Sequence, residues 1–197
     1  GEGADTMIGG AGPDTDDYSA SAAITMTLGA ASGTGSAGDA NGDTLSGIEK
    51  IEGSLNYGDT LRGNTLTSTT LWGWGGNDTF VSFSQADAVD GGSGTDTIDY
   101  SGSLAGVTVR LDGTASSGGD AAGDTILNVE HVIGSGLDDT IIGTGVNETL
   151  EGGAGDDTLV GGSGADTLDG GAGFDTADYS SSGGISVRMD GLAGTAG

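Results

Sequence analysis

A nine-residue period is the feature of this sequence that most limits its fold. Between residues 134 and 178 successive phrases begin at Gly134, Gly143, Gly152, Gly161 and Gly170 without a gap. The best preserved read GGAGDDTLV (152–160) and GGSGADTLD (161–169), so the shared pattern is G-G-x-G-x-acid-x-apolar-x. A short, strict period of this kind is typical of a solenoid, in which identical small units stack on one another.

Each phrase divides into a tight loop and a short strand. Three glycines within four positions allow positive φ and close backbone approach, which suits a tight loop with inward-pointing carbonyls. The last three residues, such as Thr158-Leu159-Val160, alternate outward, inward and outward. Two phrases then complete a flat coil of 18 residues, and phrase n stacks on phrase n+2. The fold class predicted is all-β, a parallel β-roll or β-helix solenoid.

A longer repeat encloses the short one. GGAGPDTDDYS begins at Gly9, GGSGTDTIDYS at Gly91 and GGAGFDTADYS at Gly170, so the predicted units are 9–90, 91–169 and a partial 170–197. The insert strands VTVRLD (107–112) and ISVRMD (185–190) join one roll to the next, with Val107, Val109 and Leu111 facing inward. We expect one continuous solenoid over 1–197, cut from a longer protein. Tyr18, Tyr100 and Tyr179 recur at one repeat position, where they would cap each roll against its insert.

The sixth position of the phrase is acidic, and stacking brings these carboxylates together. Asp139, Asp157 and Asp175 would line one edge of the roll, and Glu148 and Asp166 the other. Like charges stacked so closely repel each other. A divalent cation between turns removes the repulsion, and hard oxygen ligands in a loose arrangement favour Ca²⁺ over Mg²⁺. Zinc is disfavoured because the chain has no cysteine and only one histidine, His131.

The phrases GGSGTDTID (91–99), GGAGDDTLV and GGSGADTLD resemble the calcium-binding nonapeptide of the RTX family at every fixed position. The resemblance implies a parallel β-roll with several Ca²⁺ ions between neighbouring turns. It also implies that sixth-position carboxylates and loop carbonyls bind them. The metal-binding residues expected on this basis are Asp5, Asp14, Gly73, Gly75, Asp78, Gly91, Gly94, Asp96, Asp139, Glu148, Gly152, Gly155, Asp157, Gly161, Gly164, Asp166, Gly170, Gly173 and Asp175.

Some phrases depart from this pattern. Pro13 and Asp16 interrupt the phrase at Gly9, and Glu148 replaces aspartate. The phrases 64–72 and 82–90 have lost their glycines, and by alternation both lie on the same edge. We therefore expect that edge of the first unit to hold little or no calcium. The opposite edge, with Asp59, Asp78 and Asp96, keeps more, and the second unit is expected to be loaded on both edges.

The inserts contain a second acidic pattern, GDANGDTLSGIE and GDAAGDTILNVE. It does not fit an EF-hand, because Thr44 stands where glycine is needed and Lys50 where the last glutamate should be. Two interpretations stay open. One is an Asx-rich surface loop. The other is a second type of calcium site made from Asp39, Asp43, Asp120, Asp124 and Glu130.

Composition narrows the function. A net charge of −26 disfavours nucleic acid and anionic membranes as partners, and no apolar run is long enough to span a bilayer. Beyond His131 the chain offers no Ser/His/Asp set, so we do not expect an enzyme. The RTX resemblance implies a secreted or cell-surface bacterial protein, exported by type I secretion and folding on Ca²⁺ as a scaffold of the adhesin, S-layer or biofilm type. The alternative is the accessory module of a secreted lipase, protease or alginate epimerase.

Ligands other than calcium and the neighbouring repeats are not identified by the sequence. Trp72 and Trp74 flank Gly73 where the phrase is degraded. They could stack on a sugar ring, or they could cover the end of the calcium-poor edge, which is the simpler interpretation.

Overall fold

Short strands dominate the computed structural model, which describes residues 3–29, 32–81 and 85–180. The strands are β1 (Thr6–Ile8), β2 (Thr15–Asp17), β3 (Thr25–Thr27), β4 (Gly33–Gly35), β5 (Thr44–Ser46), β6 (Lys50–Glu52), β7 (Thr60–Arg62), β8 (Thr70–Trp72), β9 (Thr79–Val81), β10 (Ala88–Asp90), β11 (Thr97–Asp99), β12 (Thr108–Arg110), β13 (Thr125–Leu127), β14 (His131–Ile133), β15 (Thr140–Ile142), β16 (Thr149–Ala154), β17 (Thr158–Val160), β18 (Thr167–Ala172) and β19 (Thr176–Ala177). Two 3₁₀ turns, η1 (Gly38–Ala40) and η2 (Gly119–Ala121), lie in the inserts.

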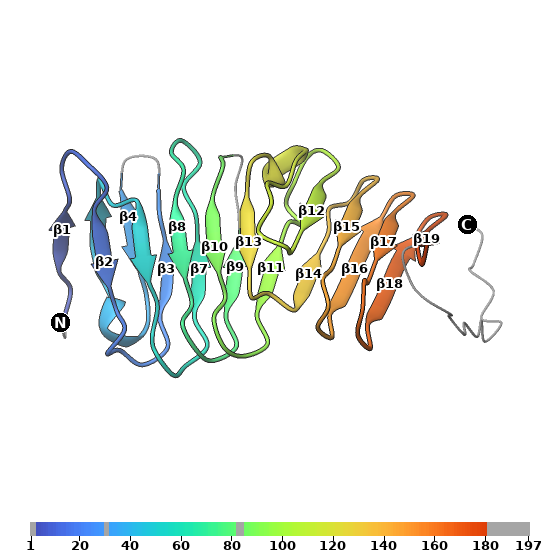
Figure 1. The fold of residues 1–197 in the computed structure, drawn as a ribbon. Coiled ribbons are helices and arrows are strands. Elements are labelled where there is room, and N and C mark those ends of the chain that lie inside the picture. The colour runs from blue at the N-terminus through green and yellow to red at the C-terminus, as the bar shows by residue number, and fades with distance from the viewer. Residues whose placement is uncertain (1–2, 30–31, 82–84, 181–197) are drawn as a thin grey trace.

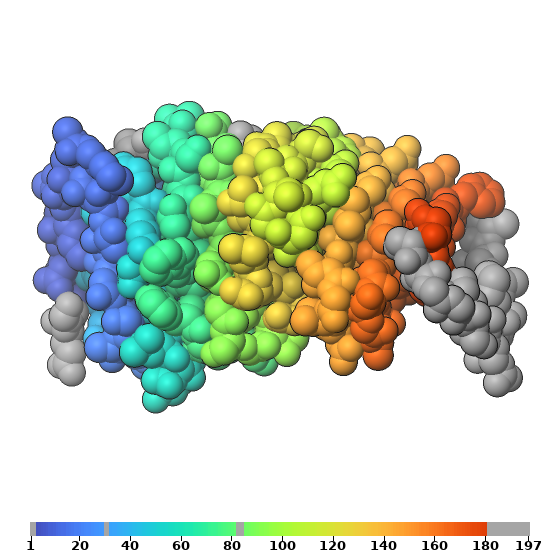
Figure 2. Space-filling view, viewed as in Figure 1, coloured from blue at the N-terminus to red at the C-terminus, as the bar shows by residue number. Residues whose placement is uncertain are grey.

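The strands form a two-faced parallel stack, with β1 at one end and β19 at the other (Figure 1). One face is a ten-stranded sheet in the order β1-β5-β4-β3-β7-β9-β11-β14-β16-β18. The other face consists of β13-β10-β8-β6-β2 followed by β12-β15-β17-β19. Figure 2 shows the chain as successive colour bands along the molecule, as expected when each turn contacts mainly its neighbours. The predicted fold class is confirmed.

The predicted 18-residue coil is confirmed by the strand register. Leu150 pairs with Leu168 on one face, and Ile141 pairs with Leu159 on the other. In the first unit the spacing widens where the phrase has extra residues, and Ile51 pairs with Leu71. The extra residues therefore lie in the loops, and the strands keep their inward-facing positions.

The core is one side chain wide. Ile51, Leu61, Leu71, Phe80 and Ile98 occupy the inward position of successive strands and are fully buried. Their neighbours on either side are partly exposed, which gives each short strand its alternating burial. A core this thin removes little apolar surface from water per residue. Its stability must therefore depend heavily on the loops at the two edges.

The inserts keep three consecutive segments on one face. Val107, Val109 and Leu111 are buried, as predicted. An antiparallel segment then lies between the two parallel strands of the insert: β4 pairs with β3 and β5 in the first unit. In the second unit the Thr108–Ser117 bridge takes this place. The sequence did not predict this segment, because GTG in β4 carries no hydrophobic alternation. The strand predicted over 185–190 lies outside the described residues.

The two inserts lie on opposite faces of the stack. Six strands, β6 to β11, separate them, and the chain changes face at each one. Each insert is fastened by its tyrosine: Tyr18 Oη donates to Asp43 Oδ2 at 2.8 Å, and Tyr100 Oη donates to Asp124 Oδ2 at 2.7 Å. The capping role predicted for these two tyrosines is confirmed, while the insert that would follow Tyr179 lies outside the described residues.

Candidate calcium-binding loops

A ladder of hydrogen bonds joins the sixth-position residues along each edge of the roll. On one edge the Asp139 N–H donates to Asp157 Oδ1 at 2.8 Å, and the Asp157 N–H donates to Asp175 Oδ1 at 3.0 Å. On the other edge the Glu148 N–H donates to Asp166 Oδ1 at 3.1 Å. The predicted stacking of these five residues on two edges is confirmed.

The same ladder of hydrogen bonds runs through the first unit, and some of its members are acidic residues of the inserts. Asp59 N–H donates to Asp78 Oδ1, Asp78 N–H to Asp96 Oδ1, and Asp96 N–H to Glu130 Oε2, at 2.7, 2.7 and 3.0 Å. Asp5 N–H donates to Asp43 Oδ1, and Asp87 N–H donates to Asp124 Oδ1, both at 2.8 Å. Three of the five residues suggested for a second type of site, Asp43, Asp124 and Glu130, are thus steps of the ladder.

The remaining two residues of that suggestion lie in the 3₁₀ turns. Asp39 is in η1 and Asp120 is in η2, where each backbone N–H donates to a serine hydroxyl. The second oxygens of Asp43 and Asp124 accept the tyrosine hydroxyls described above. Calcium binding by this set stays a prediction, and the geometry gives Asp43 and Asp124 a structural role.

Glycine-rich loops share one backbone conformation. Their second and fourth residues have positive φ, as at Gly92 (94°) and Gly94 (153°), or Gly153 (108°) and Gly155 (120°). The neighbouring turn lies so close that a Cβ added to Gly153 would come within 2.4 Å of Ser135 O. Glycine is therefore required there by both the left-handed conformation and the contact with the turn beside it.

Several of these loops bury a carboxylate oxygen that has no hydrogen-bond donor among the described residues. The Oδ2 atoms of Asp78, Asp96 and Asp157 are buried and find no hydrogen-bond partner among the described residues. A Cβ added to Gly152 would lie 2.3 Å from Asp157 Oδ2 and 2.8 Å from Gly170 O, so the carboxylate and a carbonyl of the next turn converge on one point. A buried anionic oxygen without a donor is costly, and a cation bound there would remove the cost.

The pKa values of these carboxylates also indicate that the protein alone does not stabilise their charge. Burial raises the pKa of Asp78 to about 7 and the pKa of Asp96 to about 6, despite the ladder hydrogen bond that each accepts. Burial also raises the pKa of Asp157. Neighbouring carboxylates on the ladder raise all three further. The protein alone therefore disfavours the charged form, and a bound cation would favour it.

The other glycine-rich loops repeat this arrangement with more exposure. Asp14 Oδ2 is also buried and without a partner among the described residues. A Cβ on Gly161 would lie 2.4 Å from Asp166 Oδ2, and one on Gly170 would lie 2.5 Å from Asp175 Oδ2. Asp166 is half-buried and Asp175 is exposed. Asp5, the last acidic residue of the predicted set, is exposed and lies on the ladder beside Asp43.

A second class of loop satisfies its own carboxylate. Ser135 N–H donates to Asp139 Oδ2 at 2.6 Å, and its hydroxyl donates to Asp139 Oδ1 at 2.8 Å. Ser54 N–H donates to Asp59 Oδ2 at 2.6 Å in the same way. Thr144 N–H donates to Glu148 Oε1 at 2.8 Å, although Glu148 Oε2 stays buried without a partner among the described residues. We call these the hydroxyl loops, and serine or threonine after the first glycine is their sequence signal.

The edge formed by the phrases 64–72 and 82–90 lacks the glycine-rich loop conformation in the residues that can be compared. Asn64 Nδ2 donates to Gly29 O at 3.1 Å, and Thr69 Oγ1 donates to Asp87 Oδ1 at 2.8 Å, so side-chain amide and hydroxyl groups hold this loop. None of the residues 64–69, all of which are described, has positive φ. The phrase 82–90 begins in residues 82–84, which lie outside the described part of the chain. Low calcium occupancy at this edge stays a prediction.

Asp16 and His131 are two further polar residues in the strands. Asp16 takes the inward position that Ile98 holds in the equivalent phrase; its Oδ2 is buried without a partner among the described residues, and burial raises its pKa. His131 is half-buried and lies on β14, with Nε2 3.0 Å from Glu151 Oε1.

Within the described residues no group of three or more His, Asp or Glu side chains converges on a metal position. A cation in these loops would therefore depend on backbone carbonyls as much as on carboxylates.

Comparison with known proteins matches all the glycine-rich loops and one of the three hydroxyl loops, the one that ends at Glu148. The family model described as "RTX calcium-binding nonapeptide repeat (4 copies)" matches residues 1–16, 69–98 and 142–177. These ranges contain the six glycine-rich loops and leave out the hydroxyl loops that end at Asp59 and Asp139. No curated protein matches the chain. Among the described residues no helix is long and apolar enough to cross a membrane. Over these three stretches, the chain carries RTX calcium-binding nonapeptide repeats.

Proposed function

We propose that this chain is a structural segment that folds when it binds calcium and serves as a stalk or scaffold in a secreted or cell-surface bacterial protein. The observation that carries the proposal is the set of donor-free carboxylate oxygens in the glycine-rich loops, those of Asp14, Asp78, Asp96 and Asp157. These oxygens and the adjacent glycine carbonyls would hold the ions. The ions would supply the positive charge that a chain of net charge −26 lacks.

The energy available from calcium is large enough to control folding. A site with a dissociation constant of about 100 µM adds about 1.4 kcal/mol at about 1 mM calcium. Six glycine-rich loops would then add roughly 8 kcal/mol, which is comparable with the whole stability of an ordinary domain. The segment is therefore expected to stay unfolded at low cytosolic calcium and to fold outside the cell, which suits export as an unfolded chain.

The stacked form suits a spacer. A ten-stranded face spans nine intervals, or about 43 Å at the usual strand separation of about 4.8 Å. The inserts continue the stack and leave no break in the ten-stranded sheet. Further units added end to end would lengthen the stalk in proportion. We also propose that these residues perform no catalysis of their own.

Circular dichroism and small-angle scattering of the chain test the proposal. With EGTA we expect a disordered spectrum and an expanded chain; with millimolar calcium we expect a β spectrum and a rod-like particle. Magnesium at the same concentration is the matched control and should not induce folding. A β spectrum that persists unchanged in EGTA would refute the proposal.

The alternative is that the segment is the accessory module of a secreted enzyme. Calcium-dependent folding serves both roles, because a module that folds outside the cell can hold a catalytic domain as well as a surface stalk. The two differ in what the rest of the protein contains. Sequencing the full gene product decides between them: many further repeats support the stalk, and a hydrolase or epimerase domain supports the accessory role.

A further inference from the structure

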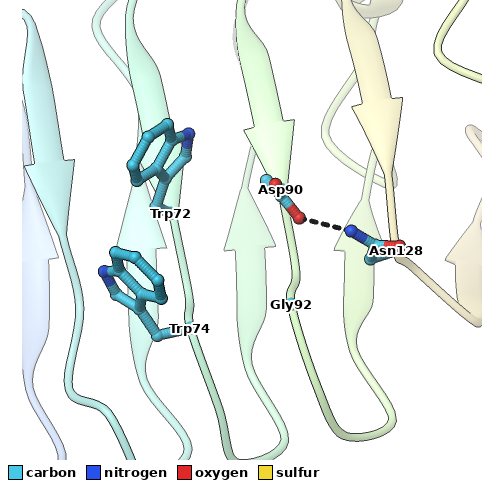
Figure 3. Close-up of a pocket in the computed structure, with 5 residues that line it drawn as sticks. All are labelled: Trp72, Trp74, Asp90, Gly92 and Asn128. Carbon is cyan, nitrogen blue, oxygen red and sulfur yellow. Dashed lines mark hydrogen bonds between the residues drawn. The ribbon is translucent and has the colours of Figure 1, made fainter.

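A pocket of about 320 Å³ lies outside the calcium loops, on the outer surface of β8, β10 and β13. Its lining residues are Trp72, Trp74, Asp90, Gly92 and Asn128. Figure 3 shows the two tryptophans on one side and the Asp90–Asn128 pair on the other, with Gly92 below Asp90 on the same segment. The volume falls at the lower end of the range for small-molecule sites.

The tryptophans form an aromatic wall that is fixed in place. Their rings are perpendicular, at 89°, with centroids 5.5 Å apart. Lys50 Nζ lies 3.2 Å from the centroid of Trp72 and bonds Glu52 Oε1 at 2.8 Å, so Trp72 is held from one side. Trp74 remains 41% exposed. An exposed indole on a rigid support offers a flat apolar surface to a ligand.

These positions correct the simpler interpretation of the two tryptophans. Trp74 belongs to the loop between β8 and β9, which ends at Asp78 on the glycine-rich edge. Residues 64–69 and 85–87, which belong to the loops predicted to be poor in calcium, lie at the opposite edge. The tryptophans therefore do not cover the calcium-poor edge.

The opposite wall is polar. Asn128 Nδ2 donates to Asp90 Oδ1 at 2.7 Å, and the carboxylate and amide together have hydrogen-bonding capacity beyond this one bond. The floor must stay open, because Gly92 has a φ of 94° and a Cβ there would come within 2.2 Å of Trp74 O. An apolar plane therefore faces a donor–acceptor pair across a gap without side chains.

The backbone at Trp74 adopts a conformation that is unfavourable for a bulky side chain. Trp74 occupies the second position of its phrase, where the intact loops have glycine, and it adopts a φ of 70°. The bond from Ser93 N–H to Trp74 O, 2.8 Å long, and the Gly75–Ser93 bridge hold this conformation. A bulky side chain in the left-handed region is a genuine outlier, and such strain gathers at functional sites.

We propose that this pocket binds a neutral hexopyranose unit of a glycan. A pyranose ring has an apolar C–H face that can stack on Trp74, and its edge carries adjacent hydroxyls that can donate to Asp90 and accept from Asn128. Asp90 and the net charge of −26 disfavour the binding of uronic and sialic acids, whose carboxylates would be repelled. This site is separate from the calcium loops, and the proposal goes beyond the scaffold role.

The test is titration of the calcium-loaded chain with methyl glucoside, methyl mannoside and methyl galactoside. Saturation-transfer NMR and tryptophan fluorescence report binding. We expect at least one hexoside to bind, and the corresponding methyl glucuronide to bind at least about tenfold more weakly. Trp74→Gly restores the glycine that intact loops have at this position. Asn128 has a φ of 53°, which glycine adopts without strain, so both Trp74→Gly and Asn128→Gly are expected to fold.

Both variants should weaken hexoside binding at least about tenfold, because each removes one wall. Leu104→Ala, at a residue that is 94% exposed and does not line the pocket, is the matched control and should bind within about twofold of the parent chain. Circular dichroism in calcium confirms that each variant is folded. The proposal is overturned if no hexoside binds, if binding survives in folded Trp74→Gly or Asn128→Gly, or if the glucuronide binds equally well.

Discussion

The two classes of loop predict opposite responses to the same substitution, aspartate to asparagine. In Asp157→Asn the new amide keeps Oδ1, which accepts the Asp139 N–H at 2.8 Å, and replaces an oxygen that has no donor among the described residues. In Asp139→Asn the ladder bond to Val107 N–H is also kept, at 2.7 Å. However, Oδ2 accepts the Ser135 N–H at 2.6 Å, and an amide placed there would face a second donor.

The magnitudes differ in their dependence on calcium. Asp157→Asn removes one cation site, so its deficit in unfolding free energy grows from about 1.4 kcal/mol at about 1 mM calcium to about 2.7 kcal/mol at about 10 mM, for a dissociation constant near 100 µM. Asp139→Asn leaves a buried N–H without an acceptor, which costs about 1–3 kcal/mol at either concentration. The first deficit should rise with calcium, and the second should stay constant.

Urea unfolding of both variants at the two calcium concentrations measures these deficits, and equilibrium dialysis counts the bound ions. Asp157→Asn should bind fewer ions than the parent chain, and Asp139→Asn should bind the same number. The reasoning is refuted if both deficits rise equally with calcium, or if Asp139→Asn loses an ion while Asp157→Asn keeps all of them.

Three further predictions concern pH, glycine and the strained tryptophan. Burial raises the folded-state pKa of Asp78 to about 7 and of Asp96 to about 6. The calcium-free folded chain therefore binds more protons than the unfolded chain between about pH 4 and 7, and its stability falls as pH rises through that window. Circular dichroism in EGTA should show more β structure at acid pH than at pH 8, and the reverse result would contradict this. Gly153→Ala should destabilise the calcium-loaded chain by at least about 1–2 kcal/mol in thermal unfolding, since φ is 108° and Ser135 O blocks the Cβ, whereas Gly145→Ala, which meets nothing within 4 Å, should be nearly neutral. Trp74→Gly relieves about 1–2 kcal/mol of left-handed strain but loses an edge-to-face contact of about 0.5–1.5 kcal/mol with Trp72, so its melting temperature should stay close to that of the parent chain; a large loss would mean that the ring is needed for folding.

The repeating part of this fold could be predicted because local spacing determines it. Once glycines and carboxylates recur every nine residues, the inward position, the strand length and the partner strand all follow, and Leu150, Leu159 and Ile141 lie where the period places them. The inserts could not be predicted to the same depth. Their antiparallel segment is made of glycine, threonine and serine, whose positions are decided by the strands on either side and not by their own pattern.

The candidate site was predicted in outline, and the difference between its loops was missed. Asp139 and Asp157 occupy the same place in the nonapeptide, so the period alone makes them equal ligands. The distinguishing signal was present one position after the first glycine, where Ser135 stands against Gly153. A serine there donates an N–H and a hydroxyl to the carboxylate, whereas a glycine takes positive φ and donates to neither oxygen in the described structure.

The position of the hydroxyl loops explains why they exist. Asp59 and Asp139 are the first carboxylates on their edges after an insert, and the ladder joins them to insert residues Ile24 and Val107. An insert offers no nonapeptide loop, so a cation at these places would have a nonapeptide turn on one side only; on that side a Cβ added to Gly134 would lie 2.5 Å from Asp139 Oδ2 and 2.4 Å from Gly152 O. Threonine hydroxyls act in a similar way on the other edge beside each insert. Thr69 Oγ1 donates to Asp87 Oδ1, and Thr144 Oγ1 donates to Glu148 Oε1.

Where an insert interrupts the stack of loops, serine and threonine therefore donate the hydrogen bonds that hold the carboxylate. Because the ladder bond to Oδ1 is the same in both classes, one loop can depend on calcium and the next can hold itself, with no change in strand register. We therefore predict that calcium dependence in this chain is a property of individual loops. It should be strongest in the turns farthest from an insert, and the two Asp→Asn variants measure it at adjacent steps of a single ladder.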